Sequence, residues 1–332
     1  MPNWKDIHPD FTEELAREWE EKGFSYEEVK EWIDIGLTVN DADYVEWLKN
    51  VKKVGVDWVL NNYDENKELK RRYKKYGLCE ECQQPNTGAE YYTKCFWCQS
   101  CNAKHFQQGF SEWTSGNTEI DEFIQKSQLQ AFNPQQVLEW IPHEKLVIDT
   151  DKPIGEGHYG EVYKAKWIDK RINKWDTGSK KWERNKVYPK SVVLKALKDS
   201  KDITTKFLKE ISYHKLFDDT LHARVVRCFG ISRDPETKKY SMVMSCVEGG
   251  NLREYLENNY SKLAFEDKFS ILVDISFSIK EIHKVELVHQ DLHPGNILIR
   301  YYLKSEIFYT QYPIKLNVCI FRYWILYVIE KI

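Results

Sequence analysis

"IGEGHYGEVYKAKW", residues 154–167, contains three glycines in the spacing G-x-G-x-x-G: Gly155, Gly157 and Gly160. In a dinucleotide-binding fold this spacing follows a buried strand and opens a helix. Here the glycines lead into "EVYKAKW", where apolar residues alternate with lysines as on a strand. A glycine loop between two strands can lie over a nucleotide with its backbone amides near the phosphates, and Val162 would then pack on the base.

Three segments downstream of the glycine loop supply further residues in a regular order. "SVVLK" ends a β-branched run with Lys195, and "TTKFLKEISYHKLF" carries Glu210 on a helical pattern. "YSMVMSCVEGGNLREYL" has the pattern of a strand, a connection and a helix, and it includes Met244 and Cys246. The order and spacing of these residues favour one shared site over unrelated surface positions.

"HQDLHPGNIL", residues 289–298, places His289, Asp291 and Asn296 on a short polar stretch that runs into apolar residues. The stretch matches the pattern H-R-D-L-x-x-x-N except at its second position. The alternative is a metal site formed by His289, Asp291 and His293, for which the sequence offers no fourth ligand nearby.

Together these segments make residues 150–300 resemble the N-lobe and early C-lobe of a protein kinase, nearest the tyrosine-kinase-like group. The resemblance implies ATP and Mg²⁺ as ligands, and it places Lys195 on the α- and β-phosphates in an ion pair with Glu210. Asp291 would accept the proton of a protein hydroxyl, with Ser/Thr and Tyr substrates both open, and Asn296 would bind Mg²⁺. The implied nucleotide-binding residues are Gly155, Gly157, Gly160, Val162, Lys195, Met244, Cys246 and Asn296.

Two positions and one inserted segment depart from the kinase pattern. Val193 stands where Ala is usual, which narrows the adenine pocket, and Gln290 replaces the Arg of H-R-D. "RINKWDTGSKKWERNK", residues 171–186, lies between the glycine loop and Lys195 as an insertion. Its D-T-G turn predicts an extra hairpin.

A larger departure follows "NILI", where a kinase shows D-F-G and then A-P-E. Neither motif occurs in residues 300–332. This predicts phosphoryl transfer at or near background by residues 1–332 alone. One explanation is a truncated or mispredicted gene product in which residues 301–332 are foreign to the fold. The other is a naturally shortened pseudokinase that acts as a nucleotide-binding scaffold.

Four cysteines, Cys79, Cys82, Cys98 and Cys101, form two C-x2-C pairs separated by fifteen residues. This spacing is typical of tetrahedral zinc sites, and a site without an open position would be structural. Cys95 offers a competing pairing with Cys98, and unliganded thiols remain the other interpretation. The region resembles the cysteine-bearing segment that precedes kinase domains in expanded fungal kinase families.

Residues 1–75 have helical patterns. In "GFSYEEVKEW", Ser25 and Glu28 predict a capping box at a helix start. A tryptophan followed four residues later by glycine occurs twice, thirteen residues apart, and a third tryptophan continues the series. Packing between short helices accounts for this pattern, and a surface for protein partners is the alternative.

Composition limits the cellular setting. Of the 332 residues, 42% are apolar and 30% charged, as in a globular protein with room for about two domains. The net charge of -3 gives no reason to expect nucleic acid, although "KELKRRYKKYG" leaves a local basic patch open. The acidic N-terminus is unlike a secretory signal, and the longest apolar run, broken by Arg322, is too short for a membrane span. We therefore expect a cytoplasmic protein.

These patterns predict an α+β fold. The expected parts are a kinase-like N-lobe with an antiparallel sheet and helix C, and a partial helical C-lobe with a long buried helix over residues 265–283. A helical region and a zinc-ribbon-like cysteine segment precede them. The expected boundaries are 1–75, 76–140, 141–300 and an atypical tail, 301–332.

Overall fold

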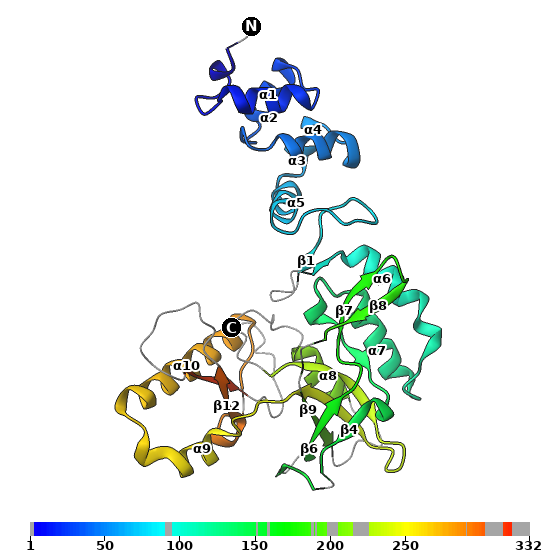
Figure 1. Ribbon diagram of the computed structural model, residues 1–332, viewed down its shortest axis with the longest axis vertical. Helices are drawn as coiled ribbons and strands as arrows, with labels where there is room; N and C mark the ends of the chain where they lie inside the picture. The colour runs from blue at the N-terminus through cyan, green and yellow to red at the C-terminus, as the bar shows by residue number, and fades with distance from the viewer. Residues whose placement is uncertain are drawn as a thin grey trace. The chain divides into compact units, whose positions relative to one another are not determined.

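The computed structural model describes residues 3–89, 95–150, 152–157, 160–186, 189, 191–197, 205–214, 226–289, 291–302 and 315–320. The chain divides into two compact units, residues 1–102 and 103–332 (Figure 1). The boundaries near residues 75, 140 and 300 stay predictions.

The first unit begins with the predicted helical region. Its elements are η1 (Trp4–Asp6), α1 (Glu13–Glu21), α2 (Tyr26–Asp34), α3 (Ala42–Trp47), the π-helical turn η2 (Leu48–Lys52), α4 (Val56–Asn61) and α5 (Tyr63–Tyr76). The predicted capping box starts α2: the Ser25 hydroxyl accepts from the Glu28 amide, and the Glu28 carboxylate accepts from the Ser25 amide. All three repeated tryptophans lie in one apolar core, which supports helix packing as the reason for the repeat.

The first unit ends with the cysteine segment. Two short strands, β1 (Gly88–Ala89) and β2 (Phe96–Trp97), pair in antiparallel fashion. They are followed at once by α6 (Gln99–Gln108), which continues into the second unit.

The second unit is built on a seven-stranded sheet. Its strand order is β3-β10-β11-β9-β6-β4, with β5 on β6, and every pairing is antiparallel except β3 with β10. The strands are β3 (Glu139–Trp140), β4 (Leu146–Ile148), β5 (Gly155–Gly157), β6 (Gly160–Trp167), β9 (Val192–Leu197), β10 (Cys228–Arg233) and β11 (Tyr240–Ser245). Alternate residues of β9 enter different cores, Val193 on one face and Val192 and Leu194 on the other, so the sheet is buried on both sides.

Helices and two hairpins complete this unit. The helices are η3 (Phe110–Glu112), α7 (Thr118–Leu129), η4 (Pro134–Gln136), η5 (His143–Lys145), α8 (Thr205–His214), α9 (Leu252–Asn259), η6 (Tyr260–Lys262), α10 (Phe265–Lys284) and η7 (Pro294–Asn296). The predicted insertion hairpin is present as β7 (Ile172–Asp176) and β8 (Lys181–Arg184). A second hairpin joins β12 (Ile297–Tyr302) to β13 (Lys315–Ile320), so part of the tail pairs with the strand after the polar loop. The α+β class is confirmed.

The long helix over 265–283 is confirmed as α10, but the face predicted to be buried is partly wrong. Ile271 and Ile282 are buried, together with Asp274 and Ser278. Four apolar residues are at least half exposed: Phe265, Phe269, Leu272 and Val273. The helix is apolar on more than one side, so its spacing alone could not identify the covered face. Among the described residues, no helix is long and apolar enough to cross a membrane.

Candidate nucleotide site and cysteine centre

Lys195 lies on β9, an inner strand of the sheet, and its side chain is essentially inaccessible to solvent. Its Nζ lies 2.7 Å from Oε1 of Glu210, which α8 supplies. A buried ammonium group is unfavourable unless it is paired and hydrogen-bonded. The ion pair therefore stabilises the lysine at this position, and the pairing predicted from the order of the motifs is confirmed.

The glycine loop lies on the strand next to Lys195. Gly155 and Gly157 of β5 pair with Val162 and Gly160 of β6, so the segment is a strand–loop–strand hairpin. Residues 158 and 159 at its tip lie outside the described residues. Val162 is the direct antiparallel partner of Lys195, and directly paired residues place their side chains on the same face of a sheet.

That face has an apolar surface made by residues from three strands. Val193 and Met244 lie opposite one another on β9 and β11, and they share a core with Val162. Leu298, two residues after Asn296, packs against the same core. It therefore connects the polar loop to the apolar surface beneath the glycine loop, a role that the sequence patterns did not reveal.

Backbone hydrogen bonds fix the connection between β11 and α9 near both of its ends. The Ser245 amide donates to the Arg227 carbonyl at 2.9 Å, and the Ile299 amide donates to the Gly250 carbonyl at 2.9 Å. A Cβ at Gly249 would overlap the Ile299 carbonyl oxygen, so only glycine allows the two backbones to approach this closely. Burial raises the pKa of the Cys246 thiol, which keeps that side chain protonated near neutral pH.

The polar loop is organised around Asn296, which is buried in η7. Its Nδ2 donates to the Asp291 carbonyl at 2.8 Å and to the Asp291 carboxylate at 3.1 Å. His293 Nε2 lies 3.7 Å from the Asp291 carboxylate, while its Nδ1 accepts from the Gly295 amide. Gln290 lies outside the described residues. Asp291 is half-buried and oriented by Asn296, an arrangement that leaves its carboxylate accessible to a substrate group.

The residues present fit a Mg²⁺ site only in part. Asn296 uses its amide nitrogen on Asp291, which leaves its carbonyl oxygen as a ligand of the kind that Mg²⁺ accepts. The kinase pattern adds a D-F-G aspartate, and the sequence contains no Asp after Asp291. Of the two protein side chains that usually bind Mg²⁺ in kinases, the sequence therefore contains the asparagine and lacks the D-F-G aspartate.

The four predicted zinc ligands converge. Their sulfurs lie within 4.8 Å of one another, with 3.8 Å between Cys79 and Cys101 and 3.6 Å between Cys82 and Cys98. Zinc–sulfur bonds of about 2.3 Å in a tetrahedron place sulfurs about 3.8 Å apart, so the spacing fits zinc. Cys95 is not in this group. In the part of the chain that the structure describes, no other set of three or more Cys, His, Asp or Glu residues converges in this way, the His289/Asp291/His293 set included.

The thiols are not suited to ionise together without a cation. The hydrogen bond to Cys79 raises the pKa of Cys98, and burial raises the pKa of Cys101 to about 12. A bound divalent cation would favour the thiolates instead. The donor set is therefore chemically suited to a metal ion.

The basic run in α5 is used within the first unit. Lys70 and Lys74 contact the buried carboxylate of Asp41, and Arg72 donates to the carbonyls of Pro85 and Asn86 beside the cysteine segment. These contacts account for three of the basic residues and do not favour a nucleic-acid surface.

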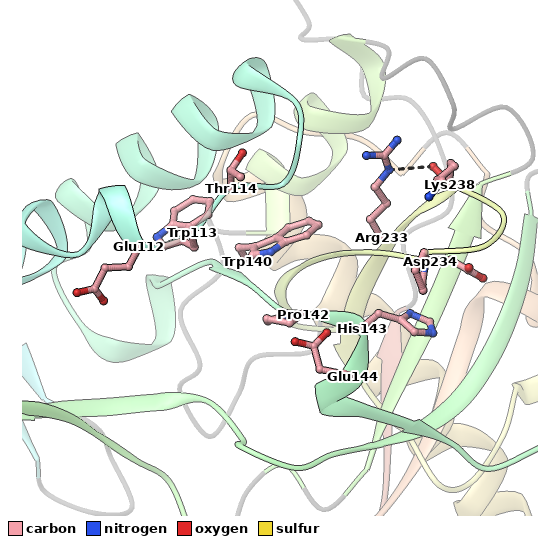
Figure 2. A pocket seen from close by; sticks show the side chains of 11 residues that line it. Glu112, Trp113, Thr114, Trp140, Pro142, His143, Glu144, Arg233, Asp234 and Lys238 are labelled. Carbon is pink, nitrogen blue, oxygen red and sulfur yellow. Dashed lines mark hydrogen bonds between the residues drawn. The ribbon is translucent and has the colours of Figure 1, made fainter.

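A surface pocket of about 590 Å³ shares no residue with the nucleotide site (Figure 2). It lies between two stretches upstream of β4 and the turn from β10 to β11, where Arg233 Nε donates to the Lys238 carbonyl at 3.3 Å. Its lining mixes acidic, basic and aromatic side chains: Glu112, Trp113, Thr114, Trp140, Pro142, His143, Glu144, Arg233, Asp234, Pro235 and Lys238. The opposing charges select no single class of ligand.

Residues 148–308 match a family model described as protein tyrosine and serine/threonine kinase. Tyrosine-protein kinase receptor svh-2 of Caenorhabditis elegans is 27% identical over 167 residues, which are 50% of this chain and 14% of that protein. Tyrosine-protein kinase SPK-1 of Girardia tigrina is 25% identical, covering 46% of this chain and 26% of the relative. A probable serine/threonine-protein kinase of Dictyostelium discoideum is 26% identical, covering 48% of this chain and 11% of that protein.

The chain thus spans about a quarter or less of the length of these relatives. The matched segment contains the glycine loop, the Lys195–Glu210 pair and the Asp291 loop, the features that kinases use to bind and transfer phosphate. Residues 148–308 of this chain therefore belong to the protein tyrosine and serine/threonine kinase family.

Proposed function

We propose that this chain acts as an ATP-dependent protein kinase, which transfers the γ-phosphate of ATP to a protein hydroxyl. The Lys195–Glu210 ion pair carries the proposal, because it sits on the sheet face shared with Val162 and Met244. A paired cation beside an apolar surface suits a nucleotide, whose phosphates are anionic and whose base is largely apolar.

Each residue has a defined part in this proposal. Backbone amides of the glycine loop contact the phosphates, and Lys195, held by Glu210, neutralises charge on the α- and β-phosphates. The backbone at Cys246 hydrogen-bonds the base, and Met244 closes the back of its pocket. The substrate hydroxyl oxygen bonds to the γ-phosphorus as the bond to the bridging oxygen of ADP breaks, and Asp291 takes the hydroxyl proton.

Mg²⁺, the usual partner of ATP in this family, would bind at Asn296 and neutralise phosphate charge when present. Because the residues fit such a site only in part, the proposed roles of Lys195 and Asp291 do not depend on it. Ser/Thr and Tyr remain equally open as acceptors, since the relatives include both kinds of kinase.

A nucleotide-binding scaffold without transferase activity is the second candidate. It is favoured by one observation, the lack of any Asp after Asp291 in the sequence. Such a protein would bind ATP through the same lysine and act through contacts to protein partners, for which the helical region of residues 1–75 is available.

Nucleotide binding tests the shared part of both candidates. Lys195→Met should weaken binding of a fluorescent ATP analogue about 10-fold or more, because it removes a charged hydrogen-bond donor. Lys166→Met, at an exposed position of the neighbouring strand β6, should leave the affinity unchanged. Equal affinities in wild type and both variants would refute the site.

A phosphoryl-transfer assay distinguishes the protein kinase from the nucleotide-binding scaffold. With radiolabelled ATP and a generic protein substrate, the kinase proposal expects labelling that is slow for want of a D-F-G aspartate, yet above the background level predicted from the sequence alone, and that disappears in Asp291→Asn. Labelling that is the same in wild type and Asp291→Asn, in a chain that binds ATP through Lys195, would favour the scaffold.

We also propose that Cys79, Cys82, Cys98 and Cys101 bind one structural zinc ion, supported by the sulfur spacing. All four coordinating positions would be filled by cysteine, so zinc would stabilise the segment rather than take part in chemistry. Free thiols and an ATP-dependent activity both favour a reducing compartment, and we propose a cytoplasmic location.

A further inference from the structure

Residues 113–141 precede the segment that matches the kinase family, yet they add a strand to the kinase sheet. β3 pairs in parallel with β10, Glu139 opposite Gly230 and Trp140 opposite Ile231. The Ile141 amide continues the pairing with a bond of 2.9 Å to the Ile231 carbonyl. A Cβ at Gly230 would overlap the Glu139 backbone, so this position of β10 is suited to the close approach of β3.

α7 shares a core with the helix that carries Glu210. Ile120 and Ile124 of α7 are fully buried, and they belong to the same apolar core as Phe207 and Ile211 of α8. Phe207 lies one helical turn before Glu210, and Ile211 follows it directly. The two helices therefore complete one continuous packing layer on the sheet face that also presents Lys195.

A third contact connects the same upstream segment to the start of the base-binding connection. Buried Arg227 donates from Nη2 to the carbonyls of Pro134 and Gln135, at 3.0 and 2.5 Å. Its own carbonyl accepts from the Ser245 amide. The upstream turn η4 thus contacts the residue that holds the end of β11 in place.

The insertion hairpin also packs against this segment. Buried Glu139 accepts from the Ile172 amide at 2.8 Å and from Nη1 of Arg184 at 2.7 Å. Just before this segment in the sequence, Phe106 of α6 stacks on the hairpin's Trp182 with ring centroids 4.1 Å apart. Two additions to the kinase pattern, one upstream and one inserted, therefore contact each other within the second unit.

We propose that residues 113–141 are a positioning part of the kinase N-lobe, in which Ile120 and Ile124 hold α8 so that Glu210 stays paired with Lys195. Their role in ATP binding rests on the proposed function, whereas their effect on α8 does not. Because packed cores resist small shifts, a cavity at Ile120 or Ile124 of α7 should loosen α8 more than it loosens the strands of the sheet.

Two matched variants of the full chain test this proposal. Ile124→Ala and Ile141→Ala remove the same atoms from buried positions, 0% and 1% exposed, within the same upstream segment. Ile124 packs in the core shared with α8, whereas Ile141 packs in the core on the opposite face of the sheet. Hydrogen–deuterium exchange of α8 amides, relative to those of β9 and β11, is the readout, and thermal unfolding is measured in parallel.

Ile124→Ala should increase relative exchange in α8 and weaken ATP-analogue binding roughly 2- to 30-fold. Ile141→Ala should lower the melting temperature to a similar extent without either effect, and Ile124→Val should restore most of the protection. Equal α8 exchange in Ile124→Ala and Ile141→Ala, or no increase in either, would overturn the proposal. If Ile124→Ala does not fold, Ile124→Val against Ile141→Val gives the comparison with a smaller expected increase in α8 exchange, and equal α8 exchange in the two would again overturn the proposal.

The exchange measurement needs no nucleotide, so it tests the positioning role of residues 113–141 separately from the proposed binding of ATP. Increased α8 exchange in a chain that does not bind ATP would support the positioning role and refute the proposed function. Unchanged α8 exchange in an Ile124→Ala chain that binds ATP through Lys195 would refute the positioning role and support the proposed function.

Discussion

At the scale of single residues, Asp41 shows how a buried charge is stabilised. Lys70 Nζ lies 2.5 Å from one of its carboxylate oxygens, and Lys74 Nζ lies 2.6 Å from the other. Burial opposes ionisation, but the hydrogen bonds from both lysines and from Thr38 outweigh it and hold the pKa of Asp41 below its usual value. The folded state therefore favours the ionised form.

This depressed pKa predicts a pH dependence of stability. A carboxylate with a lower pKa in the folded state stabilises it above the unfolded pKa, about 3.9, and the contribution is lost as pH falls through the folded pKa. In urea unfolding followed by circular dichroism, Asp41→Asn should lower the free energy of unfolding by about 2 kcal/mol at neutral pH. The difference from wild type should shrink below about pH 4; a difference independent of pH would contradict the assignment.

The cysteine centre gives a second prediction at this scale. The purified chain should contain about one zinc ion, measured by inductively coupled plasma mass spectrometry, because such sites bind tightly. Cys82→Ser removes one of the four converging thiolates and should lose the metal. Cys95→Ser should retain it, since Cys95 lies outside the group. Stoichiometric zinc in the Cys82 variant would refute the site.

Residue patterns predicted contacts where a short motif already specifies chemistry. The Lys195–Glu210 pair follows from the order of two segments after a glycine loop, and the convergence of the cysteines follows from their spacing. Leu298 and Gly249 were not predicted, because their roles arise from contacts with distant strands that no local pattern encodes.

At the scale of secondary-structure elements, the start of α2 depends on a local hydrogen-bond exchange. Ser25→Ala removes the acceptor for the Glu28 amide and should lower the free energy of unfolding by about 1 kcal/mol. Ser25→Thr keeps the acceptor and should restore most of that loss. Urea unfolding provides the measurement, and identical midpoints for wild type and Ser25→Ala would argue against a contribution from the cap.

Elements with strong local signals were predicted well, as the capping box and the D-T-G hairpin show. The covered face of α10 was not, because apolar residues occur on more than one side of that helix. β3 also escaped prediction. It has two residues and depends on pairing with β10, far along the chain, rather than on a period of its own.

At the scale of the whole molecule, the sequence predicted the order of the parts: helices, cysteine segment, kinase-like sheet and helices. The sequence patterns placed the predicted kinase domain at residues 141–300, so residues 113–140 were expected to lie outside it. That boundary stays a prediction, and packing with α8 and pairing with β10 bring residues 113–141 into the same compact unit as the kinase-like sheet. Such contacts join residues about 90 positions apart, which local periodicity cannot reveal.

Metal dependence gives the prediction that belongs to the molecule as a whole. Protein kinases hold Mg²⁺ with the catalytic-loop Asn and the D-F-G Asp, and the ion neutralises charge as phosphate is transferred. This chain presents Asn296 but no Asp after Asp291, so in the proposed site Lys195 would provide the main cation at the phosphates. Isothermal titration should show ATP affinities that differ less than about 10-fold between Mg²⁺ and EDTA, and turnover should lie well below the usual range of roughly 1–100 per second.

The Asn296→Ala variant tests the reasoning behind this expectation. Asn296 donates to both the backbone and the carboxylate of Asp291, so its loss should lower transfer through the orientation of Asp291 even when ATP affinity hardly changes. Affinity that rises 100-fold or more with Mg²⁺ in wild type, and loses that rise in Asn296→Ala, would show that a complete metal site exists. Residues 300–332 would then have to supply the carboxylate that the D-F-G aspartate usually provides, and Glu306, which lies outside the described residues, is the first acidic residue after Asn296 in the sequence.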